Sequence, residues 1–238
     1  MSEWSTLSTR LQAALGLAVP PIAITFADNV PAGVAAFDDP MPAPNEVDSR
    51  TGRVAAGCVF WMKSTDRTFS TIAEDHANCS VGSVTHGFKT IGEVAGNADV
   101  AALLGSGWVT MEIVPHIPVV TQKPAAVVYG PLADAGAPDV VLLRITGRQL
   151  MVLSDAFPGL RIEGKPQCHI VAAAKEQGDI VASVGCQLSR VRTGMANGEM
   201  TVAIPAARLD EAVTTIERTG AIDSTVARYA SADMARFA

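Results

Sequence analysis

The chain has 238 residues, of which 48% are hydrophobic and 18% charged, and its net charge is −6. This length can bury a sizeable core as one large domain or two half-sized lobes, and the composition excludes a mainly disordered chain. A net negative charge without basic clusters argues against nucleic acid as a partner. The chain lacks both a run of eighteen apolar residues and a signal-peptide pattern, so we expect a cytoplasmic protein without a membrane partner.

The N-terminal part predicts a helix, a strand and a long loop. Leucines four residues apart predict a short amphipathic helix over residues 5–17. After two prolines, the alternation over residues 22–26 predicts a strand. Residues 27–57 are rich in proline and small polar residues, which is typical of an irregular loop.

Further along the chain, strand patterns alternate with helix patterns. Residues 91–104 have helical spacing interrupted by glycines, and residues 108–114 alternate as a strand does. Apolar, β-branched runs predict buried strands, and helical spacing predicts two further helices. The strands cover residues 125–129, 139–144 and 200–204, and the helices residues 146–157 and 207–219. We therefore expect an α/β fold in which mixed sheets are packed with helices.

The four cysteines occur in two similar pairs. Cys58 precedes Cys79 by 21 positions, and Cys168 precedes Cys186 by 18. The second cysteine of each pair is followed by valine at the fifth position and glycine at the eighth, up to Gly87 in one copy and Gly194 in the other. This repeat predicts an internal duplication into two pseudo-symmetric lobes of one compact unit, residues 1–120 and 121–238.

A pseudo-twofold axis would bring the two cysteine pairs together. Four converging thiolates are the ligand set of an iron–sulfur cluster or of a structural zinc ion. Structural zinc usually includes a pair separated by only two to four residues, and no such pair occurs here. Two other interpretations stay open, namely cysteines that only pack in the core and a redox-active disulfide pair.

Residues close to the cysteines in sequence are candidates for further roles. His169 directly follows Cys168, and an imidazole there could act as ligand or proton donor, so it is the candidate catalytic residue. Lys63, Arg190 and Arg192 could offset the negative charge of a cluster or hold an anionic substrate. His76 and His86, on either side of Cys79, are weaker candidates for the same roles as His169.

Several segments together resemble a known family. They are the regions of Cys58, of Cys79 up to Gly87, of residues 138–143, of Cys168, and of residues 186–205. In their order and spacing they resemble the uncharacterised ArCR family, a domain of unknown function in archaea and bacteria, over roughly residues 10–220. The resemblance implies cysteines at the four positions held here by Cys58, Cys79, Cys168 and Cys186. It strengthens the cluster hypothesis and implies no reaction.

Two classes of function follow. The first is an enzyme with an iron–sulfur cluster, of the 4Fe–4S type, that performs a lyase, hydrolase or reductase step on a small anionic molecule. The second is a non-enzymatic small-molecule, tetrapyrrole or redox-sensing binding protein with structural cysteines. Zinc, haem or no cofactor at all are the alternatives to the cluster. A small-molecule substrate is the expected partner, together with a second copy of the chain and, for a reductase, an electron donor.

Overall fold

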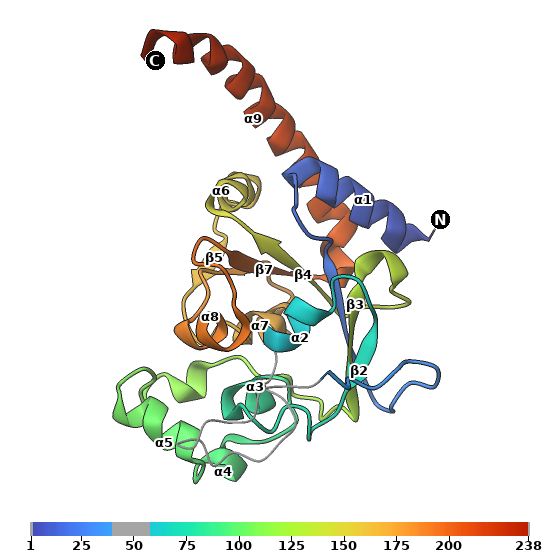
Figure 1. Ribbon diagram of the computed structural model, residues 1–238, viewed down its shortest axis with the longest axis vertical. Coiled ribbons are helices and arrows are strands. Elements are labelled where there is room, and N and C mark those ends of the chain that lie inside the picture. Colours follow the sequence, from blue (N-terminus) through green and yellow to red (C-terminus); the bar gives the residue numbers. More distant parts are fainter. Residues whose placement is uncertain (1, 40–57, 238) are drawn as a thin grey trace.

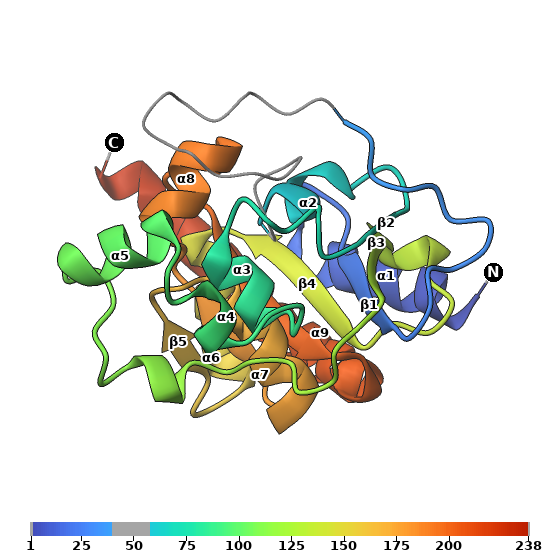
Figure 2. The ribbon, with the colours of Figure 1, turned by 90° about the horizontal axis from the view of Figure 1, so that it is seen from below.

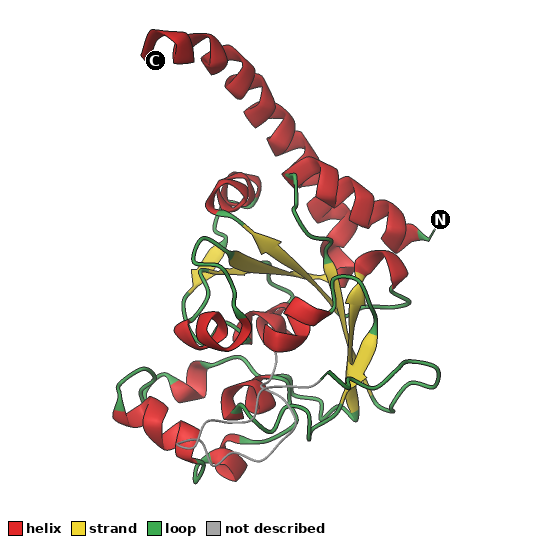
Figure 3. Cartoon of the chain, in the orientation of Figure 1, coloured by secondary structure: helices red, strands yellow, loops and turns green. Residues whose placement is uncertain are grey.

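The computed structural model describes residues 2–39 and 58–237. In these residues one seven-stranded mixed sheet carries helices on both faces, which confirms the α/β class (Figures 1 and 3). Strands from both predicted halves join this single sheet. Of the predicted loop, residues 40–57 lie outside the described residues, and residues 28–39 are irregular apart from a bridge between Ala36 and Ser70.

The strands lie in the order β2-β3-β1-β4-β7-β6-β5. All neighbouring pairs are antiparallel except β5 and β6, which are parallel. The pairing of β1 with β4 is centred on Ala23 opposite Val141. The strand bounds are β1 Ile22–Ala27, β2 Phe69–Thr71, β3 Ala126–Pro131, β4 Val140–Ile145, β5 Arg161–Glu163, β6 Val181–Ser183 and β7 Met200–Pro205.

One face of the sheet is covered by α1 (Glu3–Leu15), α6 (Gly147–Ala156) and α9 (Leu209–Phe237). Alternate strand residues such as Val141 point into this layer, where they meet Leu11 and Ile216. The helix predicted over residues 5–17 is confirmed as α1. It begins earlier because Ser2 caps it, and it ends at Gly16, which has a φ of 62°.

The other face carries α2 (Cys58–Lys63), α7 (His169–Gln177) and α8 (Gln187–Thr193) (Figure 1). Its core includes Phe60, Tyr129 and Ile170, and Cys58 and Cys168 pack against it. Farther from the sheet lie α3 (Ser80–Thr85), α4 (Ile91–Val94) and α5 (Ala98–Gly105), which Figure 2 shows from below. The cysteines therefore belong to this face.

The segment between α3 and β3 differs from its prediction. The helix expected over residues 91–104 is divided into α4 and α5 around Gly96. The strand expected over residues 108–114 is wrong, since this segment forms turns that lead into the 3₁₀ helix η1 (Val114–His116). Its amides bond locally, as from Ile113 to the carbonyl of Thr110, and Pro115 has no N–H for a strand ladder.

The remaining predicted elements are confirmed as β1, β3, β4, β7 and α6, each within two residues of its expected bounds. The last helix runs past its predicted end at residue 219. Gly220 does not terminate α9, because its role is close packing: a Cβ there would lie 3.0 Å from the carbonyl oxygen of Ala14 in α1. Beyond this contact α9 projects away from the sheet (Figure 1). Among the described residues, none of the helices combines the length and apolar content that crossing a membrane requires.

Candidate functional site

Each of the four cysteines lies on a helix or directly before one. Cys58 is the first described residue of α2, and Cys79, Cys168 and Cys186 directly precede α3, α7 and α8. The Sγ atoms of Cys79 and Cys186 accept hydrogen bonds from the amides of Gly82 and Ser189, each at 3.4 Å. The second cysteine of each pair therefore caps its helix in the same way.

The structure brings all four cysteines to one small cavity of about 30 Å³. They are half-buried thiols, contributed by four separate segments. The other lining residues are Val81, Gly82, Trp108, Pro166, Gln167, Leu188, Ser189 and Arg192. The convergence expected from the repeat is thus present in the structure.

Burial keeps the thiols of Cys58 and Cys168 protonated in the absence of a bound metal. It raises the pKa of Cys58 and of Cys168, and the neighbouring thiols raise both further. The charge of Arg192 opposes the rise in the pKa of Cys58, and a hydrogen bond from Thr85 opposes that of Cys168. A metal that binds here must therefore displace protons from these sulfurs.

A polar network fixes one wall of the cavity. The amide of Gln167 donates to Thr201 of β7 at 2.8 Å and accepts from the hydroxyl of Ser189 at 2.6 Å. Gln167 and Ser189 are both buried. This network ties the start of α8, next to Cys186, to the sheet, so the position of that thiol is well defined.

Of the three basic residues expected near the site, Arg192 alone lines the cavity. It is half-buried and takes part in no ion pair with a described residue. Lys63 lies 3.4 Å from Asp39 in an exposed ion pair. Arg190 donates to backbone carbonyls, among them that of Val184 at 2.7 Å, and so holds the loop that follows α8.

His169 does not line the cysteine cavity, although it adjoins Cys168 in sequence. It lies in a separate pocket with Arg161, Glu163 and Lys165, and its Nε2 is 3.9 Å from a Glu163 oxygen. Burial lowers the pKa of His169, and Glu163 partly opposes that shift. The ring therefore faces a charged neighbourhood in a pocket separate from the cavity that the thiols line.

Sequence reasoning missed Tyr129, Trp108 and the Gln167 network. Tyr129 is fully buried on β3, and its hydroxyl has no hydrogen-bond partner among the described residues. Burial raises the pKa of Tyr129, and the nearby thiols of Cys168 and Cys58 add to this rise. No local pattern marks these residues, because they meet the cysteines only through the sheet and through the segment after α5.

The donor set suits soft metals, and its arrangement limits how a metal can bind. Thiolates are the ligands of zinc and of iron–sulfur clusters. In the described residues, no group of three or more histidine, cysteine, aspartate or glutamate side chains is placed to hold a single metal ion. The site is therefore a ring of thiols around a cavity rather than a preformed site for one ion.

Comparison with known proteins places the chain in a family. No curated protein and no solved structure matches it. A family model described as uncharacterised ArCR matches residues 10–215, which include all four cysteines and every strand of the sheet. The chain therefore belongs to the uncharacterised ArCR family, as its sequence resemblance indicates.

Proposed function

We propose that Cys58, Cys79, Cys168 and Cys186 hold an iron–sulfur cluster of the 4Fe–4S type. The observation that carries this proposal is the convergence of four thiols, from four separate segments, on one cavity. Each thiolate of such a cluster binds a different iron, so the cluster needs thiols around a space and not four sulfurs at one point. A cubane is larger than the present cavity, so its binding requires the cavity to widen.

The surroundings suit an anionic cluster. Backbone amides already donate to Cys79 and Cys186, and hydrogen bonds to sulfur tune the potential of a cluster. The buried Tyr129 hydroxyl is a further donor without a partner among the described residues. Arg192 supplies a positive charge at the cavity. Zinc is the alternative for the same thiols, and metal analysis separates the two.

We propose further that the protein is an enzyme for a small anionic molecule. When bound, the cluster would supply either a Lewis-acidic iron or a one-electron path, which suits a lyase, hydrolase or reductase step. Arg192 would bind and orient the anion, while Lys63 and Arg190 are engaged elsewhere. A reductase step would add an electron-donor protein as partner. A reducing cytoplasm would keep the four cysteines as thiols.

We infer that the two halves arose by internal duplication. The strand order on the two sides of the β1–β4 contact corresponds, with β3 and β2 on one side and β7 and β6 on the other. Pro131 pairs with Ile22 at the start of β1, and Pro205 pairs in the same way with Val140 at the start of β4. α2 packs on α8, and α3 packs on α7. A twofold axis that exchanges α2 with α7 and α3 with α8 turns the first of these contacts into the second.

The test of the cluster is anaerobic purification followed by iron, sulfide and zinc analysis and an absorption spectrum. We expect brown protein with about four irons per chain and broad visible absorption. Cys168→Ser should lose most of the iron. Ser64→Ala should keep it, because Ser64 is a buried serine directly after α2 that does not line the cavity. Thermal melting of both variants checks that they fold.

Other outcomes would contradict the cluster and favour a defined rival. Colourless protein with one zinc per chain indicates a structural metal. A Soret band indicates a tetrapyrrole protein. Iron-free protein whose thiol count falls on mild oxidation and recovers with reductant indicates a non-enzymatic redox sensor.

A further inference from the structure

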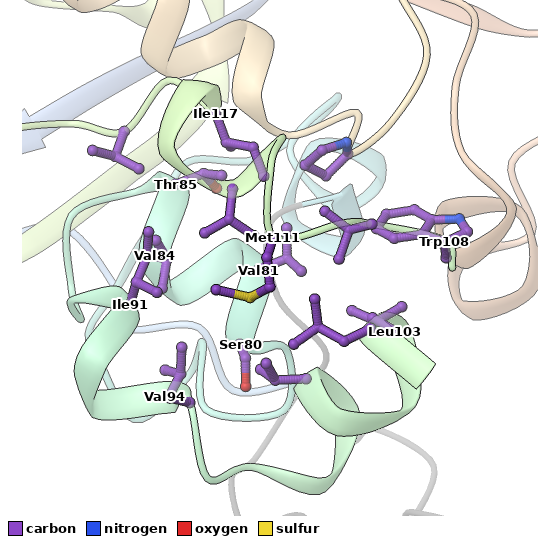
Figure 4. A pocket seen from close by; sticks show the side chains of 17 residues that line it. Ser80, Val81, Val84, Thr85, Ile91, Val94, Leu103, Trp108, Met111 and Ile117 are labelled. Carbon is purple, nitrogen blue, oxygen red and sulfur yellow. The ribbon is translucent and has the colours of Figure 1, made fainter. Parts of the chain in front are cut away.

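A second, larger cavity adjoins the cysteine site. It has a volume of about 140 Å³, and its walls come from α3, α4, α5, η1 and the turns between them. Almost all lining side chains are apolar, among them Val84, Val94, Leu103, Met111 and Ile117 (Figure 4). In this view the ring of Trp108 lies at one end of the cavity.

The two cavities share part of their walls. Val81, Trp108 and Pro166 line both of them. Thr85 lines the apolar cavity and lies close enough to Cys168 to oppose the rise in the pKa of that thiol. A molecule in the apolar cavity therefore lies next to the thiols, on the far side of Val81 and Trp108.

Most of the residues that line the apolar cavity belong to a segment that has no counterpart in the second half of the chain. Forty residues, 86–125, connect α3 to β3, whereas the six residues 194–199 connect α8 to β7. Within this segment α5 carries the sequence ADVAALLG, yet none of its residues is fully buried. Leu103 and Leu104 line the cavity and remain half-exposed, so the chain itself leaves this apolar surface unfilled.

The apolar cavity has few polar groups that could hydrogen-bond to a water molecule. The hydroxyl of Ser80 is already bonded to Asp99 at 2.7 Å and to Asn97 at 2.8 Å. The Thr85 hydroxyl is bonded to the carbonyl of Gly82. A space lined by apolar groups, whose few polar groups are satisfied, favours a hydrocarbon over water.

We propose that this cavity binds the apolar part of the substrate, an aliphatic or aromatic group of about six to eight carbons, whose anionic end lies towards Arg192. The proposal deepens the function proposed above and rests on it for the place of the reacting end. A cavity of about 150 Å³ lined by apolar residues accommodates a benzene molecule, which sets this size class. Substrates of this kind are amphipathic carboxylates or similar anions rather than sugars or nucleotides.

The test is calorimetric titration of the anaerobically purified full-length protein with acetate, butyrate, hexanoate and octanoate. We expect the affinity to rise by about fourfold for each methylene that enters the cavity. Leu103→Trp fills the cavity from its half-exposed wall and should abolish this rise; Val109→Trp is a second filling variant. Ile222→Trp, at an exposed apolar site on α9, is the matched control and should bind as the wild type does.

Arg192→Gln tests the position of the anionic end and should weaken butyrate and octanoate by the same factor. Equal affinity for all four acids, or a chain-length dependence that survives both filling variants, would overturn the proposal. An unchanged affinity in Arg192→Gln would overturn the orientation. If the purified protein contains no iron but its affinity still rises with chain length, the cluster proposal is contradicted and the cavity proposal is supported. If it contains iron but its affinity does not depend on chain length, the cluster proposal is supported and the cavity proposal is contradicted.

Discussion

Two buried histidines lie close together on the cysteine-bearing face of the sheet. The ring centroids of His76 and His86 are 5.3 Å apart, and both side chains are fully buried. The Thr71 hydroxyl donates to the carbonyl of Val127, so it accepts from Nε2 of His76 at 3.0 Å. Nδ1 of His86 lies 3.0 Å from the carbonyl of Gly82 and so carries the proton. Both rings are therefore held neutral.

Because His86 is buried in its neutral form, the free energy of unfolding depends on pH. Burial lowers the pKa of His86 from 6.5 to about 4 and that of His76 well below 6.5. The unfolded chain takes up protons below pH 6.5 and the folded chain does not, so stability is full above that pH and is lost as the pH falls towards 4. Between pH 7 and pH 5, His86→Gln should lose about 2 kcal/mol less unfolding free energy than the wild type.

Urea unfolding at the two pH values measures this difference. His116→Gln is the matched control, because that histidine is exposed, and it should keep the wild-type pH dependence. A His86→Gln variant that loses as much stability as the wild type would show that His86 is not the group responsible.

Asp139 connects three elements through one carboxylate. Its oxygens accept from the amide of Phe26 at 2.7 Å and from Nζ of Lys175 at 2.8 Å, so the start of β4 is tied to β1 and α7. Asp139→Asn should lower the unfolding free energy by about 1–3 kcal/mol. Asp179→Asn, which breaks an exposed pair with Arg161, should cost less than about 1 kcal/mol. Equal losses in the two variants, measured by urea unfolding, would contradict the role of Asp139.

Among the helices and strands, those with strong hydrophobic periodicity in the sequence were predicted correctly, whereas segments with weak periodicity were not. The leucine spacing of α1 and the β-branched runs of β3, β4 and β7 each have one consistent burial pattern, so they could be predicted from the sequence. Residues 108–114 alternate as a strand does, but several of them line a cavity instead of pairing in the sheet. Local patterning reports which side chains avoid water and not which neighbour they meet.

The long C-terminal helix has two parts with different energetic roles. Leu209, Val213 and Ile216 are fully buried, and Glu217 pairs with Arg10 of α1 at 2.9 Å. Beyond Gly220 the described side chains are mostly exposed, including Ile222 and Tyr229. The first part therefore stabilises the fold, whereas the second projects from it.

Truncation separates these parts. Deleting residues 221–238 should change the unfolding free energy by less than about 1 kcal/mol, because it removes little buried apolar surface. Ile216→Ala, in the packed part, should cost about 2–5 kcal/mol. Thermal and urea unfolding measure both variants. A large loss on truncation would mean that the projecting part is covered by another surface in solution.

At the scale of the whole molecule, the convergence of the cysteines could be expected from the sequence, but their surroundings could not. The repeated spacing after Cys79 and Cys186 is a local signal, and in the structure both thiols cap helices. Gln167, Tyr129 and Trp108 reach the site from a loop, a central strand and an inserted segment. The role of these three residues depends on how elements that are distant in the sequence pack together. Hydrophobic periodicity in a single sequence does not predict such packing.

Because of its two cores, we expect the chain to unfold as one cooperative unit. Each core contains residues from both halves, such as Leu11 with Ile216 on one face and Phe60 with Ile170 on the other. Splitting the chain between Gly136 and Ala137, both exposed, should therefore give two fragments that co-purify when expressed together and do not fold alone. Affinity capture through a tag on one fragment measures the complex. A cooperative melt of either isolated fragment would show two independent domains instead.

The symmetric pairing of β1 with β4 has a consequence for ancestry. Under the duplication proposed above, a half-length ancestor would have carried two cysteines and would have paired with itself along the strand now represented by β1 and β4. Its four-thiol site would have formed only in the dimer and would have been lost on dilution. Under the same proposal, joining the copies would have made the site independent of protein concentration. It would also have left one copy free to acquire the inserted segment, residues 86–125, while the other kept its short connection.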